Sequence, residues 1–220
     1  MSETVLSVKN LTFSAEGRNI LDHISLNIHE GEIVTFTGPS GSGKSTLLKL
    51  ISSIISPTSG NIFYKGTDIL EIPATEYRKK VSYFFQNAVL FGETVRDNLS
   101  FPYEIRNERL DEQKAKQFLE EVRLPSNYLD QPVHELSGGE KQRVALVRNM
   151  MFMPEVLVLD EVTSSLDTEN SDIILSLVKK INQQEGCTVL WVTHKDKEIQ
   201  EAHRLIEVKD GGVRELELSK

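Results

Sequence analysis

The stretch GPSGSGKST, at residues 38–46, has the composition of a phosphate-binding loop. It fits the pattern G-x-x-x-x-G-K-[ST], in which glycines let backbone N–H groups surround phosphate oxygens. A helix that begins here directs its positive end at the phosphates, Lys44 can reach the β- and γ-phosphates, and Ser45 can ligate Mg²⁺. A flexible Gly/Ser turn is the alternative, but the stretch follows a predicted strand and precedes an apolar-periodic helix, as phosphate binding requires. The residues expected to bind the nucleotide are Gly38, Pro39, Ser40, Gly41, Ser42, Gly43, Lys44, Ser45 and Thr46.

Two carboxylates end the stretch EVLVLDE, at residues 155–161. A buried strand that ends this way would place Asp160 beyond the carboxyl end of the strand, where open α/β sheets bind ligands, and would let it hold Mg²⁺ through water. Glu161 is then a candidate base that polarises the attacking water. Taken alone, acidic residues after a strand often cap the next helix or face solvent. The phosphate-binding stretch favours the metal and base roles.

Two further polar residues follow apolar runs: Gln86 after VSYFF, and His194 after TVLWVT. A lone glutamine or histidine in such a place usually has a structural role. If the apolar runs are parallel neighbours, however, their ends meet at one edge of a sheet. Gln86 could then contact Mg²⁺ and the attacking water, and His194 the γ-phosphate. The other histidines have no such context and are assigned no role: His23, His29, His134 and His203.

The stretch LSGGEKQR, at residues 136–143, predicts a helix that opens on two glycines. Ser137 and Glu140 have the S-x-x-E spacing of a capping box, which alone would explain a helix start. It does not explain Gly138 and Gly139, because each glycine costs about 1 kcal/mol inside a helix. Bare amides at a positive helix end form an anion site, but no lysine follows as in the first loop. This stretch therefore resembles half of a site, which needs a nucleotide held by something else.

Short apolar runs predict the strands that must position these residues. Near-continuous runs rich in β-branched and aromatic residues suit strands buried on both faces of a parallel sheet. The predicted strands are VLSVKN (5–10), ISLNI (24–28), IVTFT (33–37), VSYFF (81–85), VLVL (156–159) and TVLWV (188–192). The last four would form the parallel core, and GG at 211 and 212 predicts a terminal hairpin turn.

Helical spacing appears in two parts of the chain. Apolar residues after Lys44 recur at helical spacing until Pro57 stops the pattern. Between about residues 88 and 150 the segments DEQKAKQFLEEV and GGEKQRVALVRNMMFM indicate helices, with no convincing strand among them. We therefore expect a helical lobe inserted between two halves of an α/β core.

The composition is that of an ordinary globular protein, with 220 residues of which 39% are hydrophobic and 26% charged. The net charge of -8 argues against a broad nucleic-acid-binding face, and Arg78, Lys79 and Lys80 are expected to form a solvated face. The N-terminus lacks the pattern of a secretory signal, and no run of eighteen apolar residues is present. The single cysteine, Cys187, is expected to be partly buried in a reducing compartment. Any membrane role would then depend on a partner.

In their order, these motifs resemble the nucleotide-binding subunit of ATP-binding-cassette (ABC) transporters over essentially the whole chain. GPSGSGKST resembles Walker A, Gln86 the Q-loop, LSGGE the signature, LVLDE Walker B, SSLD the D-loop and His194 the switch histidine. The resemblance implies a P-loop NTPase fold of the ABC type, with a mostly parallel core, N-terminal antiparallel strands and an inserted helical subdomain. It implies one domain over residues 1–220, with the core at about 1–87 and 151–220 and the helical subdomain at about 88–150.

The resemblance also implies a mechanism in which two copies pack head to tail around ATP and Mg²⁺, forming a homodimer. Ser137, Gly138 and Gly139 of one copy would then serve the γ-phosphate held by the other. The implied catalytic residues are Lys44, Gln86, Glu161 and His194, and the implied metal-binding residues are Ser45, Gln86 and Asp160. The implied partner is a separate transmembrane permease, with the subunit on the cytoplasmic face of the membrane and no nucleic acid bound. Val89, Leu90 and Phe91 would face the permease or, equally, lie in the core.

Two stretches show a narrower resemblance, to the stand-alone ABC ATPases of the Fet type, which are proposed to export iron. They are SYFFQNAVLFGETVRDNLSFPYEIRN and VLWVTH. Two positions depart from the broader ABC pattern. Ala15 stands where an adenine-stacking aromatic is usual, with Phe13 out of step, so adenine stacking is expected to be weak. Val162 replaces a usual proline, with little expected consequence.

Three rival functions fit the sequence less well. A soluble ABC ATPase of DNA repair or translation would typically carry coiled-coil insertions or tandem cassettes, which are not seen in this sequence. A regulatory domain that binds nucleotide without turnover would release no phosphate, so a phosphate-release assay distinguishes it from an ATPase. A P-loop kinase would leave LSGGE and His194 unexplained.

Overall fold

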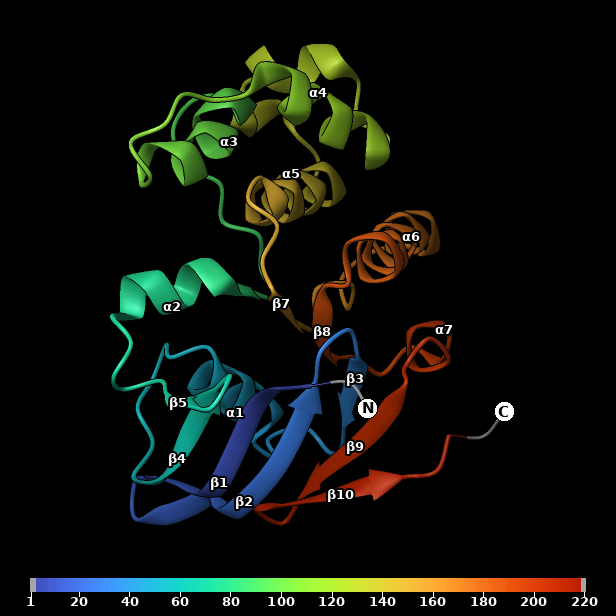
Figure 1. Cartoon of the computed structure of the whole chain (residues 1–220). Helices are drawn as coiled ribbons and strands as arrows, with labels where there is room; N and C mark the ends of the chain where they lie inside the picture. Colours follow the sequence, from blue (N-terminus) through green and yellow to red (C-terminus); the bar gives the residue numbers. More distant parts are fainter. Residues whose placement is uncertain (1–2, 219–220) are drawn as a thin grey trace.

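A computed structural model describes residues 3–218 as an α/β protein with two sheets (Figure 1). Its strands are β1 (Thr4–Ala15), β2 (Arg18–His29), β3 (Ile33–Thr37), β4 (Ser59–Tyr64), β5 (Thr67–Asp68), β6 (Val81–Phe84), β7 (Val156–Asp160), β8 (Thr188–Val192), β9 (Arg204–Lys209) and β10 (Gly212–Leu216). Its helices are α1 (Lys44–Ile51), α2 (Ala74–Lys80), α3 (Val95–Glu104), α4 (Glu112–Glu121), η1 (Ser126–Asp130), η2 (Val133–Glu135), α5 (Gly138–Met150), α6 (Thr168–Glu185) and α7 (Asp196–Ile199). Across residues 3–218, no helix combines the length and apolar character needed to cross a bilayer.

The larger sheet has six strands in the order β10-β9-β3-β8-β7-β6. All neighbours from β9 to β6 run parallel, and the terminal strand β10 is antiparallel to β9. The predicted parallel grouping of β3, β6, β7 and β8 is therefore confirmed. The smaller sheet, in the order β2-β1-β4-β5, is antiparallel, so the expected N-terminal antiparallel strands are also present. The fold class predicted from the ABC resemblance is confirmed.

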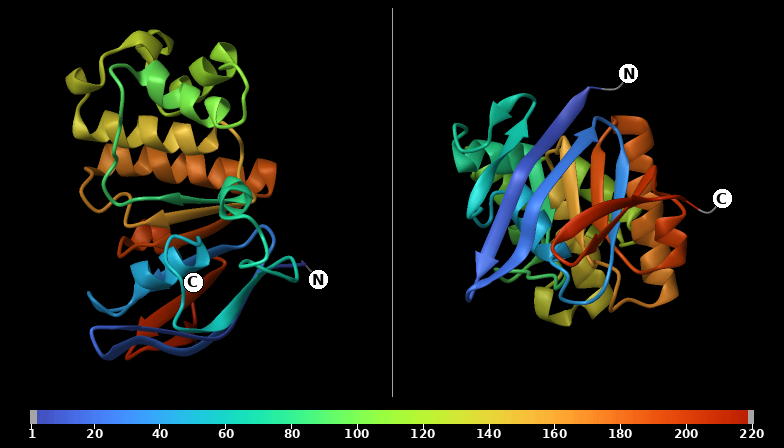
Figure 2. Two further views of the ribbon diagram at one scale, coloured as in Figure 1. Left: turned by 90° about the vertical axis from the view of Figure 1, so that its left-hand side faces the viewer. Right: turned by 90° about the horizontal axis from the view of Figure 1, so that it is seen from below.

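Alternate side chains of the central strands face two different cores. On β7, Leu157 and Leu159 belong to the cluster that includes α3, α4, α5 and α6, whereas Val156 and Val158 belong to the cluster around α1 and the smaller sheet. Successive strand side chains point to opposite faces, so one continuous apolar run fills both cores. Figure 2 shows the resulting layers, with α5 and α6 over one face of the larger sheet and α1 between the two sheets.

Helices α3, α4 and α5 follow β6 in the chain and stack beyond the sheet (Figure 1). Thr94 and Asp97 form a capping box at the start of α3, and the carboxylate of Asp111 caps α4. The two helices expected at residues 111–122 and 138–153 are confirmed as α4 and α5. Helix α5 ends at Met150, sooner than predicted, and Pro154 disfavours helical conformation in Met153, the last residue of the predicted helix.

Helix α1 is also shorter than predicted. The apolar spacing favoured a helix that continues to Pro57, but α1 ends at Ile51. Ser53 has a φ of 55°, a left-handed conformation that ends an α-helix, and Ile54 N donates to Lys49 O at 2.9 Å. Ile55 still packs against the core of this side, so its apolar character reflects burial rather than helix.

Two smaller predictions need adjustment. The terminal hairpin is present, but its left-handed turn residues are Asp210 (φ 49°) and Gly211 (φ 76°), so Gly212 is the first residue of β10. Cys187 is not partly buried but fully buried, with 2% of its surface exposed. It packs in the core shared by the helices and the sheet.

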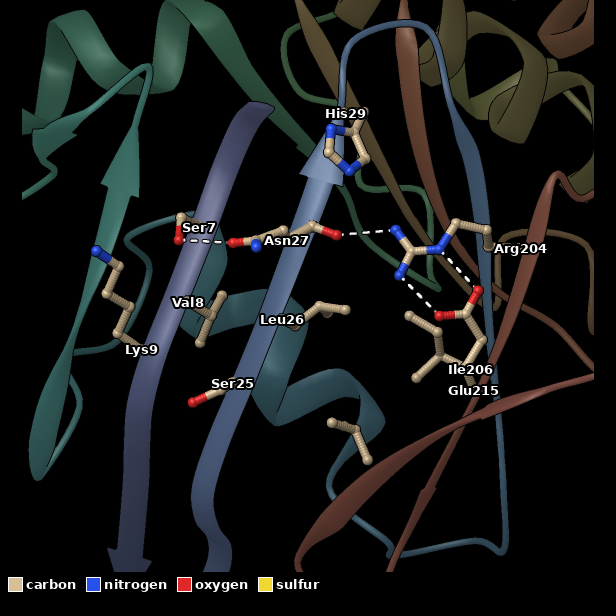
Figure 3. A pocket seen from close by; sticks show the side chains of 11 residues that line it. Ser7, Val8, Lys9, Ser25, Leu26, Asn27, His29, Arg204, Ile206 and Glu215 are labelled. Carbon is tan, nitrogen blue, oxygen red and sulfur yellow. Dashed lines mark hydrogen bonds and ion pairs between the residues drawn. The ribbon is translucent and has the colours of Figure 1, made fainter. Parts of the chain in front are cut away.

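Arg204, at the start of β9, joins the two sheets (Figure 3). Its guanidinium donates to Asn27 O on β2 at 2.8 Å and, through two N–H groups, to Glu215 on β10 at 2.9 and 3.0 Å. These groups border a hollow of about 520 Å³. Arg204 pairs with Val34, near the start of β3, whereas the phosphate-binding stretch follows the end of that strand.

Candidate functional site

Residues 38–43 form a loop between β3 and α1 whose backbone requires glycine at two positions. Gly38 has a φ of 133°, and a Cβ there would lie 2.1 Å from Val208 O. Gly43, the N-cap of α1, has a φ of 100°, and a Cβ there would lie 2.9 Å from Leu21 Cδ2. Both positions combine a left-handed backbone with close neighbours, so a side chain is excluded by conformation and by space. The predicted strand, glycine loop and helix are present in that order.

Lys44 begins α1 and is almost fully buried, with 5% of its surface exposed. Its Nζ donates to Gly38 O and Pro39 O, both at 2.8 Å. An ammonium has three N–H donors, and these carbonyls use two of them. The loop therefore holds a positive charge against its own backbone, with a third N–H donor for an oxygen of a phosphate.

Asp160, the last residue of β7, is held at both carboxylate oxygens. Ser45 Oγ donates to Oδ1 at 2.8 Å, and the hydroxyl of Tyr83 on β6 donates to Oδ2 at 2.5 Å. Ser45 and Asp160 were predicted as metal-binding residues, and the structure places them in contact. Tyr83 was not predicted from the sequence, because it lies within an apolar run that indicated only a buried strand.

Glu161 follows β7 in a strained conformation, with a φ of 49°. Its N–H donates to Val192 O at 3.0 Å, which fixes it to the end of β8. Gln86 Nε2 donates to Glu161 Oε2 at 3.2 Å, while His194 Nε2 lies 4.0 Å from Oε1. The carboxylate is thus flanked by the two polar residues predicted to join it, one on each side.

Strand register explains why these four strand ends converge. Phe84 is opposite Leu159, Asp160 is opposite Val192, and Phe36 is also opposite Val192. The residues that follow each strand therefore lie along one edge of the sheet. Parallel α/β sheets bind ligands at this carboxyl edge.

The stretch at residues 137–139 lies at the exposed start of α5. Ser137 Oγ accepts from Glu140 N at 3.3 Å, and the carboxylate of Glu140 accepts from Ser137 N at 2.8 Å, which confirms the predicted capping box. Ser137 and Gly138 are exposed, and Gly139 is partly exposed. Within residues 3–218, the N–H groups of Gly138 and Gly139 have no acceptor, as expected for the first turn of a helix.

The two glycines differ in their surroundings. A Cβ at Gly138 would meet nothing within 4 Å, whereas a Cβ at Gly139 would lie 2.8 Å from the side chain of Asn170 on α6. A side chain at Gly139 would therefore have to displace the side chain of Asn170. The fold gives no comparable reason for glycine at 138.

Gln142 is a further residue that sequence reasoning missed. It is buried on α5, donates to Gln86 O at 3.3 Å and Val162 O at 2.8 Å, and accepts from Ala88 N at 3.1 Å. It therefore ties the helix of the LSGGE stretch to the segments that carry Gln86 and Glu161. A glutamine on the apolar-periodic face of a predicted helix is the signal that could have found it.

The donor set fits a magnesium ion. Asp160 and Ser45 offer a carboxylate and a hydroxyl in contact, and Mg²⁺ prefers oxygen ligands of this kind together with those of phosphate and water. Over the described residues, no three His, Cys, Asp or Glu side chains gather as a metal-holding group. Such a site would depend on the bound nucleotide.

Comparison with known proteins agrees with this geometry. Residues 21–164 match the family model "ABC transporter". The chain is 45% identical, over 92% of its length and 90% of the relative, to the "Probable iron export ATP-binding protein FetA" of Escherichia coli (strain K12). It is 36% identical, over 98% of its length and 62% of the relative, to the "Spermidine/putrescine import ATP-binding protein PotA" of Spiroplasma citri.

Among solved structures, the chain is similar to a dimeric post-hydrolysis state of the ATP-binding cassette MJ0796 bound to ADP and Pi. The TM-score is 0.87 at 32% identity, with 98% of this chain and 99% of that chain covered. The family match spans more than half of the chain, and both relatives are ATP-binding proteins of transport systems. The chain belongs to the ABC transporter family and is one of its ATP-binding, ATP-hydrolysing subunits.

Proposed function

We propose that ATP draws two copies of this chain together head to tail. The tip of α5 in one copy then covers the triphosphate held by the phosphate loop of the other. The observation that carries this proposal is the pair of bare amides at Gly138 and Gly139, which lies at a positive helix end but is not followed directly by a lysine as the phosphate loop is. Dimers of the similar cassette MJ0796 support the arrangement.

Within each site, we assign roles from the contacts already described. Lys44 and the loop N–H groups would bind the phosphates, and Ser45, Asp160 and Gln86 would hold Mg²⁺, which would neutralise phosphate charge. Glu161 polarises the attacking water, which can reach it because 29% of its side chain is exposed. Gln86 orients that carboxylate, and His194 contacts the γ-phosphate.

The dimer proposal is tested with a Glu161→Gln variant, which keeps the shape of the side chain but loses the base. It should bind ATP, hydrolyse it poorly and run as a dimer in size-exclusion chromatography with mass measurement when ATP and Mg²⁺ are present. A Lys44→Ala, Glu161→Gln double variant is the matched control and should remain monomeric. Wild-type turnover by Glu161→Gln would remove the base assignment, and a variant that stays monomeric at saturating ATP would remove the head-to-tail dimer.

A groove of about 860 Å³ beside Gln86 is the surface we propose for the permease. Its apolar members include Phe85, Val89 and Phe91, which are 54%, 69% and 40% exposed. Such an exposed apolar group is typical of a docking surface. The charged side chains along the groove are mainly basic, namely Arg78, Lys79, Arg106 and Arg148, with Glu76 opposing them. A short amphipathic helix with acidic residues is therefore the partner that fits.

The helical segment would pass movement between the permease and the nucleotide. We propose that, within a single domain over residues 1–220, residues 88–150 act as a helical subdomain inserted into a core of residues 1–87 and 151–220. Gln142 links α5 to the segment that contains Gln86, so displacement of the groove would reach the base through these bonds. ATP can drive the cycle only if it binds the closed dimer better than the open monomer.

For the cargo, we propose iron export through a separate permease, with this subunit on the cytoplasmic face of the membrane. The FetA relative supports iron and export, while the PotA relative is named for import, so direction needs its own measurement. Cells that lack this chain should retain more radioactive iron after loading, and wild-type chain but not Glu161→Gln should restore efflux. Unchanged efflux would remove the cargo proposal, and reduced initial uptake in place of reduced efflux would reverse its direction.

A further inference from the structure

Tyr83 is hydrogen-bonded to Asp160, a residue of the proposed magnesium site. It lies on β6 opposite Val158 of β7, and its side chain extends toward the carboxyl end of the sheet, where its hydroxyl donates to Asp160 Oδ2 at 2.5 Å. Asp160 is 6% exposed, so this bond is shielded from competing water. A hydroxyl has one hydrogen, and Tyr83 uses it on the carboxylate.

The other oxygen of Asp160 completes a chain of three residues. Ser45 Oγ donates its only hydrogen to Oδ1 at 2.8 Å, which leaves the lone pairs of that oxygen for a cation. Rotation of the Asp160 carboxylate would break one of the two bonds. The hydroxyl of Tyr83 therefore fixes the orientation of Asp160, and Asp160 in turn fixes the orientation of Ser45.

Two further contacts hold Tyr83 itself. Its ring packs edge-to-face on Phe85, with centroids 4.8 Å apart, and its carbonyl lies 3.5 Å from Asn149 Nδ2 on α5. These two contacts fix the donor in place.

We propose that Tyr83 is a positioning residue for the divalent cation, acting through Asp160 and Ser45 on the magnesium that accompanies ATP. Hydrogen-bond partners of metal ligands typically change metal affinity by about 10- to 100-fold when they are removed. The proposal rests on the magnesium site under "Proposed function" but needs neither the dimer nor the permease.

The test compares nucleotide binding with and without metal. Binding of the non-hydrolysable analogue adenylyl imidodiphosphate is measured by calorimetry in Mg²⁺ and in EDTA, so no turnover is involved. Tyr83→Phe keeps the ring and loses only the hydroxyl. We expect the preference for the magnesium complex to fall about 10-fold, with affinity in EDTA within about 2-fold of wild type.

Two comparisons separate positioning from a merely structural role. Tyr77→Phe removes another buried hydroxyl, one that donates to Ile51 O at 2.6 Å, and should lower stability without changing the metal preference. In an Asp160→Asn background, Tyr83→Phe should have little further effect, because its route to the metal is already lost. Tyr83→Phe with an unchanged metal preference would overturn the proposal. If the wild-type chain bound the analogue equally well in Mg²⁺ and in EDTA, the magnesium site itself would be overturned. The wild-type measurement therefore distinguishes a failure of the magnesium site from a failure of the positioning role of Tyr83.

Discussion

Replacing Gly138 with alanine should strengthen the fold while it damages the enzyme. Gly138 is the first residue of α5, has no left-handed φ, and has open space where alanine would carry its methyl group, with no neighbour within 4 Å. Alanine is favoured over glycine in helices by about 0.5 to 1 kcal/mol, partly because glycine loses more chain entropy on folding. A gain of this size corresponds to a rise of about 1 to 4 °C in Tm for a chain of this length.

The ATPase rate of Gly138→Ala should fall, although its stability rises. If the phosphate of a second copy must approach the bare amide of Gly138, the added methyl group occupies that space. Overpacking typically costs about 1 to 3 kcal/mol, which corresponds to a loss of roughly 5- to 150-fold in the ATPase rate. Phosphate release and thermal unfolding are measured on the same preparation. ATP binding by the separated monomer should be unchanged, because the phosphate loop of the same copy is untouched.

A substitution to alanine at an exposed helix position serves as the control. Gln183 is exposed on α6, so Gln183→Ala should leave both stability and activity close to wild type. Gly138→Ala with a full ATPase rate would show that no phosphate approaches this amide. A fall in stability would instead refute the open space at this position.

Three further predictions concern other parts of the chain. Burial alone would raise the pKa of Glu155, but bonds from Lys65, Tyr64 and Lys80 outweigh it and lower the pKa to about 2, against 4.5 ordinarily. This group therefore adds stability above pH 4.5, roughly 1 to 2 kcal/mol since a third of the side chain meets solvent, and loses it as pH falls toward 2. The free energy of unfolding of Glu155→Gln, measured in urea, should therefore fall less than that of wild type as the pH is lowered. An equal fall with pH in both proteins would contradict this. Burial raises the pKa of Cys187 to about 12, so the native thiol should resist iodoacetamide and react only after unfolding; rapid native labelling would contradict its placement. Gly38→Ala should abolish ATP binding and lower Tm, because its methyl would meet Val208 O; a stable variant that binds ATP normally would contradict the loop geometry.

The central strands, and the sheet edge at which they all end, could be predicted from the sequence. Each of these strands is a short apolar run followed by a polar residue. Helix ends were less predictable. Ile54 and Ile55 continue the helical spacing of α1, yet Ser53 turns the backbone, since burial can keep a residue apolar after the helix has ended. Spacing alone does not distinguish these cases.

The site divides in the same way. The contact between Ser45 and Asp160 could be anticipated from two motifs, whereas Tyr83 could not, because an aromatic in a buried strand is ordinarily core. Its role depends on the register between β6 and β7, which becomes visible only in the fold. The pairing of α5 with a second copy was implied by family resemblance, and the residues themselves indicated only half a site.

Mixing two impaired variants tests the shared site most directly. Lys44→Ala should lose phosphate binding by its own loop but keep an intact start of α5. Gly138→Ala should keep phosphate binding by its own loop, but its added methyl group should block the approach of phosphate to α5. If each site takes one part from each copy, an equal mixture should recover roughly a quarter of the wild-type ATPase rate, because half of the dimers are mixed and each holds one intact site of two. A mixture no more active than the sum of the separate variants would contradict the account.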